Sequence, residues 1–136
     1  MVETRIMSNA DKLKQLYNQA NSLNEELPGD LMKKLSLYGR ILELLGGFHA
    51  SSMKTWKLAE ATRREALASA YTYANGNSAK DKENQAEILA AESRRNEALA
   101  EAEAMRWKNA YTSTQEQIQI MKLQLRDMKD VQGGGV

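Results

Sequence analysis

The most constraining feature of this sequence is a long stretch, from Ser78 to about Val131, that contains neither proline nor glycine. Along it, positions separated by three and four residues form a heptad-like a/d series: Ala86, Ala90, Ser93, Glu97, Ala100, Ala104, Trp107, Tyr111, Thr114, Ile118, Met121, Leu125 and Met128. A repeat sustained over about six heptads predicts a coiled-coil-like helix of about 75 Å, at roughly 1.5 Å per residue. Such a helix packs its seam against other helices.

The first residues of the chain predict a shorter helix. Ser8 followed by Asp11 is typical of a helix N-cap with an acidic residue at the third helical position. Apolar residues then recur with helical spacing, which predicts a helix over residues 9–27. Pro28 and Gly29 are expected to end it.

A second apolar pattern follows directly. Asp30 can cap a helix over residues 31–45, and the same rhythm continues over residues 48–74. Between the two ranges lie Gly46 and Gly47. This pair is compatible with a kink in one long helix or with a true break, and we favour the kink.

The Asn-Gly-Asn sequence at residues 75–77 is the strongest turn signal in the chain. Ser78 repeats the capping pattern of the N-terminus and opens a helix over residues 79–130. No segment alternates with the period of two that marks a strand. We therefore expect an elongated all-α hairpin in one helical domain, residues 1–131, followed by a flexible tail at residues 132–136.

A register follows from this turn. If the flanking helices run antiparallel with equal rise, Trp107 faces Gly46 and Gly47, so that a bulky indole meets two residues without side chains. Large apolar residues then meet at the far end: Leu31 and Met32 with Met121 and Lys122, Leu35 with Ile118, and Leu42 with Tyr111. The first helix is short enough to complete a three-helix core there with residues 31–45 and 108–128.

Nearer the turn, between Ala59 and Ala104, the seam is mostly alanine. Each alanine buries little apolar area at about 25 cal/mol per Å², so an isolated two-helix arm is expected to be marginal. Either a second copy of the chain or another partner must complete it, and we expect a homodimer. The residues assigned to the core or dimer seam are Trp56, Leu67, Ala90, Ala100, Trp107, Tyr111 and Ile118.

Composition excludes several functional classes. The 136 residues include no cysteine, which removes disulfide frameworks, zinc ribbons, iron–sulfur sites and thiol nucleophiles. A net charge of +1 gives the whole chain no general attraction to nucleic acid or anionic membrane. The sequence shows neither a targeting segment nor an apolar stretch long enough to span a membrane. We expect a cytoplasmic protein.

Residues for catalysis or metal binding are sparse. His49 is the single imidazole, and only Ser51, Ser52 and Asp30 are near it in sequence as partners for a nucleophilic triad. The acidic residues of the long helix lack the Glu-x-x-His pairing of di-metal bundles, so we expect them to form salt bridges with nearby arginines. No phosphate-binding loop is present. We expect no enzyme activity, no cofactor and no metal.

The clearest candidate contact surface is basic. Residues 31–74 carry seven basic and three acidic side chains, and Lys54, Lys57 and Arg64 fall on one helical stripe. Lys33, Lys34 and Arg40 are candidates to extend it. Phosphate contact and protein contact are both open for this stripe, and the absence of interleaved exposed aromatics disfavours base stacking. Tyr73, beside the turn, is the aromatic expected to be exposed and to offer a second contact.

A run in the long helix also carries a family resemblance. It comprises Ala86-Glu87, then the sequence Glu-Ala-Glu-Ala-Met-Arg-Trp-Lys-Asn-Ala at residues 101–110, then Gln117-Ile118 and an end rich in Leu, Met and Lys. With it, residues 55–130 resemble small all-helical proteins from the early or DNA-metabolism regions of temperate phages of Gram-positive bacteria. The resemblance implies a protein without enzymatic activity that assists recombination or replication, or that blocks host factors, including CRISPR effectors.

Together these features predict a non-enzymatic interaction protein that binds and occludes, or recruits, a host protein or nucleoprotein complex. Two alternatives remain: a nucleic-acid-binding accessory factor of phage recombination or replication, and a structural or scaffolding component.

Overall fold

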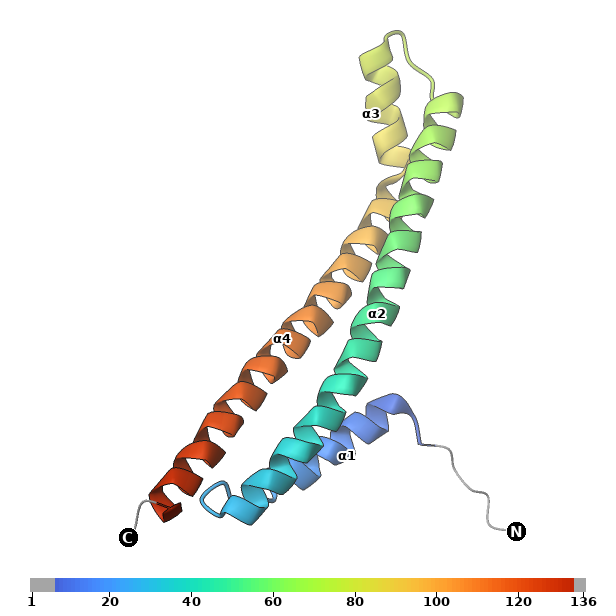
Figure 1. Cartoon of the computed structure of the whole chain (residues 1–136). Helices are drawn as coiled ribbons and strands as arrows, with labels where there is room; N and C mark the ends of the chain where they lie inside the picture. Colours follow the sequence, from blue (N-terminus) through green and yellow to red (C-terminus); the bar gives the residue numbers. More distant parts are fainter. Residues whose placement is uncertain (1–6, 134–136) are drawn as a thin grey trace, which may run out of the picture. The chain divides into compact units, whose positions relative to one another are not determined.

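The computed structural model describes residues 7–133, and this part of the chain forms four helices and no strand (Figure 1). The predicted all-α fold is confirmed. The chain divides into two compact units, where the sequence predicted one domain. Unit 1 takes in the chain up to Gly47 together with the residues from Asn109 onward, and unit 2 comprises residues 48–108.

Helix α1 (Asn9–Asn21) starts where the capping pattern predicts. The Oγ atom of Ser8 accepts a hydrogen bond from the backbone N–H of Asp11 at 3.1 Å, which satisfies one of the free donors of the first turn. The helix buries one apolar stripe: Leu13, Leu16 and Ala20.

The connection between α1 and α2 (Pro28–Tyr73) differs from the prediction, because α1 ends before residues 22–27. Pro28 begins α2 instead of ending α1. At the first helical position its missing N–H costs nothing. Asp30 lies inside the first turn of α2 and accepts a hydrogen bond from the backbone N–H of Asn24 at 3.1 Å, so it ties the loop to the helix instead of capping it.

Helix α2 runs without interruption through Gly46 and Gly47, which excludes a break at this pair. The separate helices predicted over residues 31–45 and 48–74 are therefore one. A methyl group at Gly46 would lie 3.3 Å from the ring of Tyr111, whereas one at Gly47 would meet nothing within 4 Å. Only the first glycine is thus closely approached by a neighbouring side chain.

The prediction that Trp107 faces the glycine pair is wrong. Tyr111 lies against Gly46, and Trp107 stacks on Phe48 with ring centroids 4.6 Å apart. The register assumed uninterrupted helices on both sides of the turn. That assumption fails at Ala90.

Ala90 separates α3 (Ala79–Leu89) from α4 (Ala91–Gly133), where the sequence predicted one helix. Its backbone leaves the helical region, with φ −92° and ψ 4°, although its N–H still donates to the carbonyl of Ala86 at 2.9 Å. Ser78 caps α3 as predicted, accepting a hydrogen bond from Asp81 N at 3.1 Å. No glycine or proline marks the irregularity at Ala90, which explains why the pattern missed it.

The a/d series nevertheless describes the inward face of α3 and α4 well. All of its members, from Ala86 to Met128, are buried or half-buried. Within unit 1 this face packs on α2 through Leu31, Ile118 and Met121, and within unit 2 Arg63 of α2 pairs with Glu97 of α4, so that α2 packs against α4 as the predicted helical hairpin requires. The spacing of the series therefore identified the packing face in spite of the irregularity.

Unit 1 contains a three-helix core. Its central cluster joins Leu31 of α2 to Ile118 and Met121 of α4, and five half-buried residues pack against it: Leu35, Tyr38, Leu42, Leu125 and Met128. Helix α1 completes the core. The ring of its Tyr17 meets that of Tyr38 edge to face with centroids 6.4 Å apart. The predicted three-helix section is confirmed.

Unit 2 contains no comparable core. Its buried residues are all alanines: Ala74, Ala86, Ala90 and Ala104. Arg63 of α2 and Glu97 of α4 form a half-buried ion pair in the seam. Large apolar side chains of this unit face solvent instead: Leu58, Tyr71, Tyr73, Ile88, Leu89, Leu99 and Met105. Because the two helices pack through alanines, their larger apolar side chains lie on the solvent-exposed faces.

The predicted flexible tail begins at residue 132, but helix α4 extends through Gly133. Residues 134–136 of that tail lie outside the described residues. Within residues 7–133, no helix combines the length and apolar character needed to cross a membrane.

Candidate functional site

The predicted basic stripe lies on the exposed side of α2 in unit 2, where Lys54, Lys57 and Arg64 are all exposed. Its charge is smaller than the sequence suggested. Glu60 lies between its members and pairs with both Lys57, at 3.4 Å, and Arg64, at 2.8 Å. The spacings of three and four residues from Glu60 were a readable signal for this pairing.

Lys34 does not extend the stripe. Its side chain is buried in unit 1, and its Nζ atom lies 2.7 Å from Glu25 Oε1. Lys33 and Arg40 are exposed on the same helix. The candidate cationic surface of unit 2 is therefore the short set of Lys54, Lys57 and Arg64.

Two exposed aromatics lie at the end of α2. Tyr73 is 79% exposed, as the sequence predicted. Tyr71 is 40% exposed, and the ammonium group of Lys82 lies 5.5 Å from the centroid of its ring. Aromatic side chains presented in this way are typical anchors for a protein partner.

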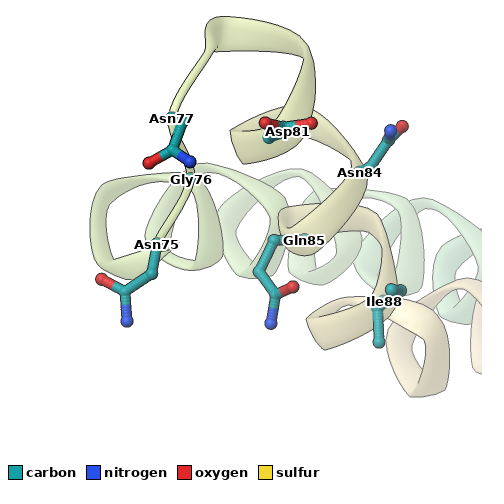
Figure 2. Close-up of a pocket in the computed structure, with 7 residues that line it drawn as sticks. All are labelled: Asn75, Gly76, Asn77, Asp81, Asn84, Gln85 and Ile88. Carbon is teal, nitrogen blue, oxygen red and sulfur yellow. The ribbon is translucent and has the colours of Figure 1, made fainter.

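Beyond them, the turn forms a shallow cavity of about 510 Å³. Its lining is mostly amide: Asn75, Gly76, Asn77, Asp81, Asn84, Gln85 and Ile88. Figure 2 shows the side chains of Asn75, Gln85 and Ile88 projecting to the same side. Glycine is required at position 76, because a methyl group there would lie 2.8 Å from Asp81 Cβ. Amides can donate and accept hydrogen bonds, but they supply no general base or nucleophile.

A second hollow, of about 600 Å³, lies between α2 and α3; we call it the α2–α3 groove. Helix α2 contributes Arg64, Leu67, Ala68 and Tyr71, and helix α3 contributes Glu83, Asn84, Ala86 and Glu87. The sequence predicts Leu67 in the seam and gives no signal for the two glutamates. Their position opposite Arg64 depends on how α3 folds back on α2.

The residues assigned to the core or seam lie as follows. Ala90 and Ile118 are buried, while Trp56, Leu67, Ala100, Trp107 and Tyr111 are half-buried. The indole N–H of Trp107 donates to Glu103 Oε1 at 2.8 Å, and the corresponding nitrogen of Trp56 is buried without a hydrogen-bond partner. Both tryptophans thus pack within unit 2.

The residues considered for catalysis are not brought together. The Nε2 atom of His49 is buried and has no hydrogen-bond partner, so it is not placed to take a proton from Ser51 or Ser52. Among residues 7–133, no three acidic or histidine side chains gather in a way that would hold a metal ion. Glutamates of α3 and α4 pair with arginines instead, such as Glu87 with Arg94 at 2.8 Å.

One titratable group in unit 1 is perturbed. Burial raises the pKa of the Tyr17 phenol, an effect that its hydrogen bond to Thr114 opposes in part. Tyr17 joins α1 to the other two helices, through its ring against Tyr38 of α2 and its hydrogen bond with Thr114 of α4.

Comparisons with protein families, with curated proteins and with solved structures give no match for this chain.

Proposed function

We propose that this chain is a non-enzymatic interaction protein that binds a protein or nucleoprotein complex through unit 2 and occludes it. The observation that carries the proposal is the contrast within unit 2: its buried residues are all alanine, while Leu58, Leu99 and Tyr73 face solvent. Exposed apolar side chains on a helical scaffold are typical of protein-binding surfaces. Lys54, Lys57 and Tyr73 are the contacts that we assign to the partner, and Arg64, the third member of the stripe, borders the α2–α3 groove.

The resemblance to helical phage proteins supports a host target in the bacterial cytoplasm, such as a CRISPR effector. A rigid helical pair suits occlusion, because it presents its side chains without a large ordering cost on binding.

Direct nucleic-acid binding through the stripe is the competing interpretation. Glu60 argues against it, because its carboxylate pairs with two of the three cations and lowers the attraction to phosphate. Titrating salt against binding to single- and double-stranded oligonucleotides distinguishes the two, since phosphate contacts give an affinity that falls steeply with salt. A structural role would instead place the protein in assembled phage particles.

The test is affinity capture from the host with three versions of the full chain. The first is the wild type. The second carries Lys54→Glu and Lys57→Glu, and the third carries Lys12→Glu and Lys14→Glu on exposed positions of α1 as a matched charge control. Arg64 is left unchanged because it also lines the α2–α3 groove.

The proposal expects a protein that is retained by the wild type and by the α1 variant and is lost from the α2 variant. Circular dichroism should show equal helicity in all three, because every substituted lysine is exposed. Equal retention by all three versions would reject the assigned contacts.

A further inference from the structure

We propose that the α2–α3 groove is a self-association site, occupied by the same groove of a second copy, with the two copies related by a two-fold axis that runs along the helices. This inference deepens the proposed function by naming a partner for one surface of unit 2. Three observations carry it.

The first is the lack of a core. A section of two helices whose buried residues are alanines, with its larger apolar side chains half-buried or exposed, gains little from the hydrophobic effect, and packing against further helices is the usual remedy. Leu67, Ala68 and Ala86 give the groove an apolar floor of small and medium side chains. Small side chains let another helix pair approach closely.

The second is the distribution of charge around the groove. Its cationic lining residue, Arg64, belongs to α2, whereas its anionic lining residues, Glu83 and Glu87, belong to α3. The Arg64 side chain is 70% exposed and Glu83 is also exposed. The lining charges of the two rims are thus opposite in sign, and each belongs to a different helix. Within the same chain Arg64 also pairs with Glu60, Glu87 pairs with Arg94, and Lys82 of α3 lies over the Tyr71 ring. The exposed Arg64 guanidinium and Glu83 carboxylate are therefore the charges that we assign to the contact between copies.

The third is what symmetry requires. In a two-fold interface the same patch meets itself, so the patch must be self-complementary. With the axis along the helices, the α2 rim of one copy faces the α3 rim of the other and opposite charges meet. With the axis across the helices, each rim faces its own copy and like charges meet. The charge pattern therefore selects the first arrangement, in which both Asn-Gly-Asn turns lie at the same end.

The test is a charge-exchange experiment on the full chain, read by sedimentation equilibrium. Arg64→Glu makes both rims acidic, and Glu83→Arg with Glu87→Arg makes both rims basic. Each variant alone should self-associate at least about tenfold more weakly than the wild type, because like charges then face one another. An equimolar mixture of the two should recover a dimer, since opposite charges meet again.

Arg106→Glu is the matched control. Arg106 lies in the same unit, is 68% exposed and pairs with a glutamate of its own helix, as Arg64 does, but it does not line the groove. Its substitution should leave self-association unchanged. An equal loss of self-association in the Arg106 variant and in the two groove variants would overturn the placement of the interface.

The direction of the axis has its own test. Because the natural chain contains no cysteine, Asn77→Cys introduces a single thiol at the turn. Two turns at the same end should be joined by a flexible bis-maleimide cross-linker long enough to span two packed helix pairs, in the wild-type background but not in the Arg64→Glu background. Dimers that never cross-link at this position would overturn the parallel arrangement.

The failure of this inference is separable from that of the proposed function. A chain that stays monomeric throughout the micromolar range while still retaining a host protein through Lys54 and Lys57 rejects self-association only. A chain that dimerises through the groove but retains no host protein rejects the proposed target only.

Discussion

Units 1 and 2 share helix α2 and the same three-four spacing of inward positions, but they differ in the size of what they bury. Unit 1 places Leu31, Ile41, Leu45 and Met121 out of contact with solvent, and unit 2 places only alanines there. Helical periodicity is therefore sufficient to bring helices together in both units. Only unit 1 has the apolar volume that stabilises the packing without help.

The largest expected effect concerns the core of unit 1. Leu31→Ala should lower the free energy of unfolding by about 2–5 kcal/mol, because Leu31 is fully buried and its truncation leaves a cavity. Leu58→Ala is the control in unit 2: at 59% exposure it should change the free energy by less than about 0.5 kcal/mol. Urea unfolding followed by circular dichroism measures both. Similar values for the two would remove the contrast between the units.

The next effect probes the alanine seam. Ala104→Leu should destabilise unit 2 by about 1–3 kcal/mol, since Ala104 is buried between closely spaced helices and a larger side chain forces them apart. Ala102→Leu, on an exposed position of α4, adds the same atoms without this strain. Hydrogen exchange of residues 48–108 gives the readout. If the two variants behaved alike, the seam would be looser than described.

A smaller effect is expected at the glycine pair. Gly47→Ala should stabilise the chain by roughly 0.5–1 kcal/mol, because alanine is the better helix former and nothing lies within 4 Å of the new methyl group. Gly46→Ala should stabilise the chain less, because its methyl group would lie only 3.3 Å from the ring of Tyr111. Thermal unfolding of both variants compares them. A larger gain at Gly46 would contradict the observed contact.

The smallest effect is confined to alkaline solution. Burial raises the pKa of Tyr17 in the fold above its ordinary value of 10.0, so the neutral phenol is favoured in the folded state. The resulting stability is fully present below pH 10 and is lost as pH rises through the folded pKa. Tyr17→Phe should therefore lose less stability than the wild type above pH 10 in urea titrations. Identical alkaline profiles would contradict the burial of this hydroxyl.

Sequence patterns predicted the helical content, both serine caps and the inward face of α3 and α4, because each depends on neighbours within one or two turns. They did not predict the irregularity at Ala90, where no breaker residue stands. The register that placed Trp107 opposite the glycines assumed one unbroken helix after the turn. Short-range rules are reliable for periodicity and weak for the distance between helices.

Of the candidate surfaces, the sequence likewise predicted one and not the other. The exposure of Tyr73 and of the Lys54, Lys57 and Arg64 stripe followed from helical spacing. The α2–α3 groove did not, because Glu83 and Glu87 reach the neighbourhood of Arg64 only through the folding of α3 against α2.

By itself, the sequence determined an all-α chain whose long helices carry large apolar residues toward one end and alanine toward the other, since side-chain size and spacing are written residue by residue. Tertiary structure decided that the chain forms two units, that Tyr111 and not Trp107 lies against Gly46, and that charges of opposite sign line one groove. The physical reason is that these features depend on the relative position of separate helices, which is set by the packing of all their side chains together.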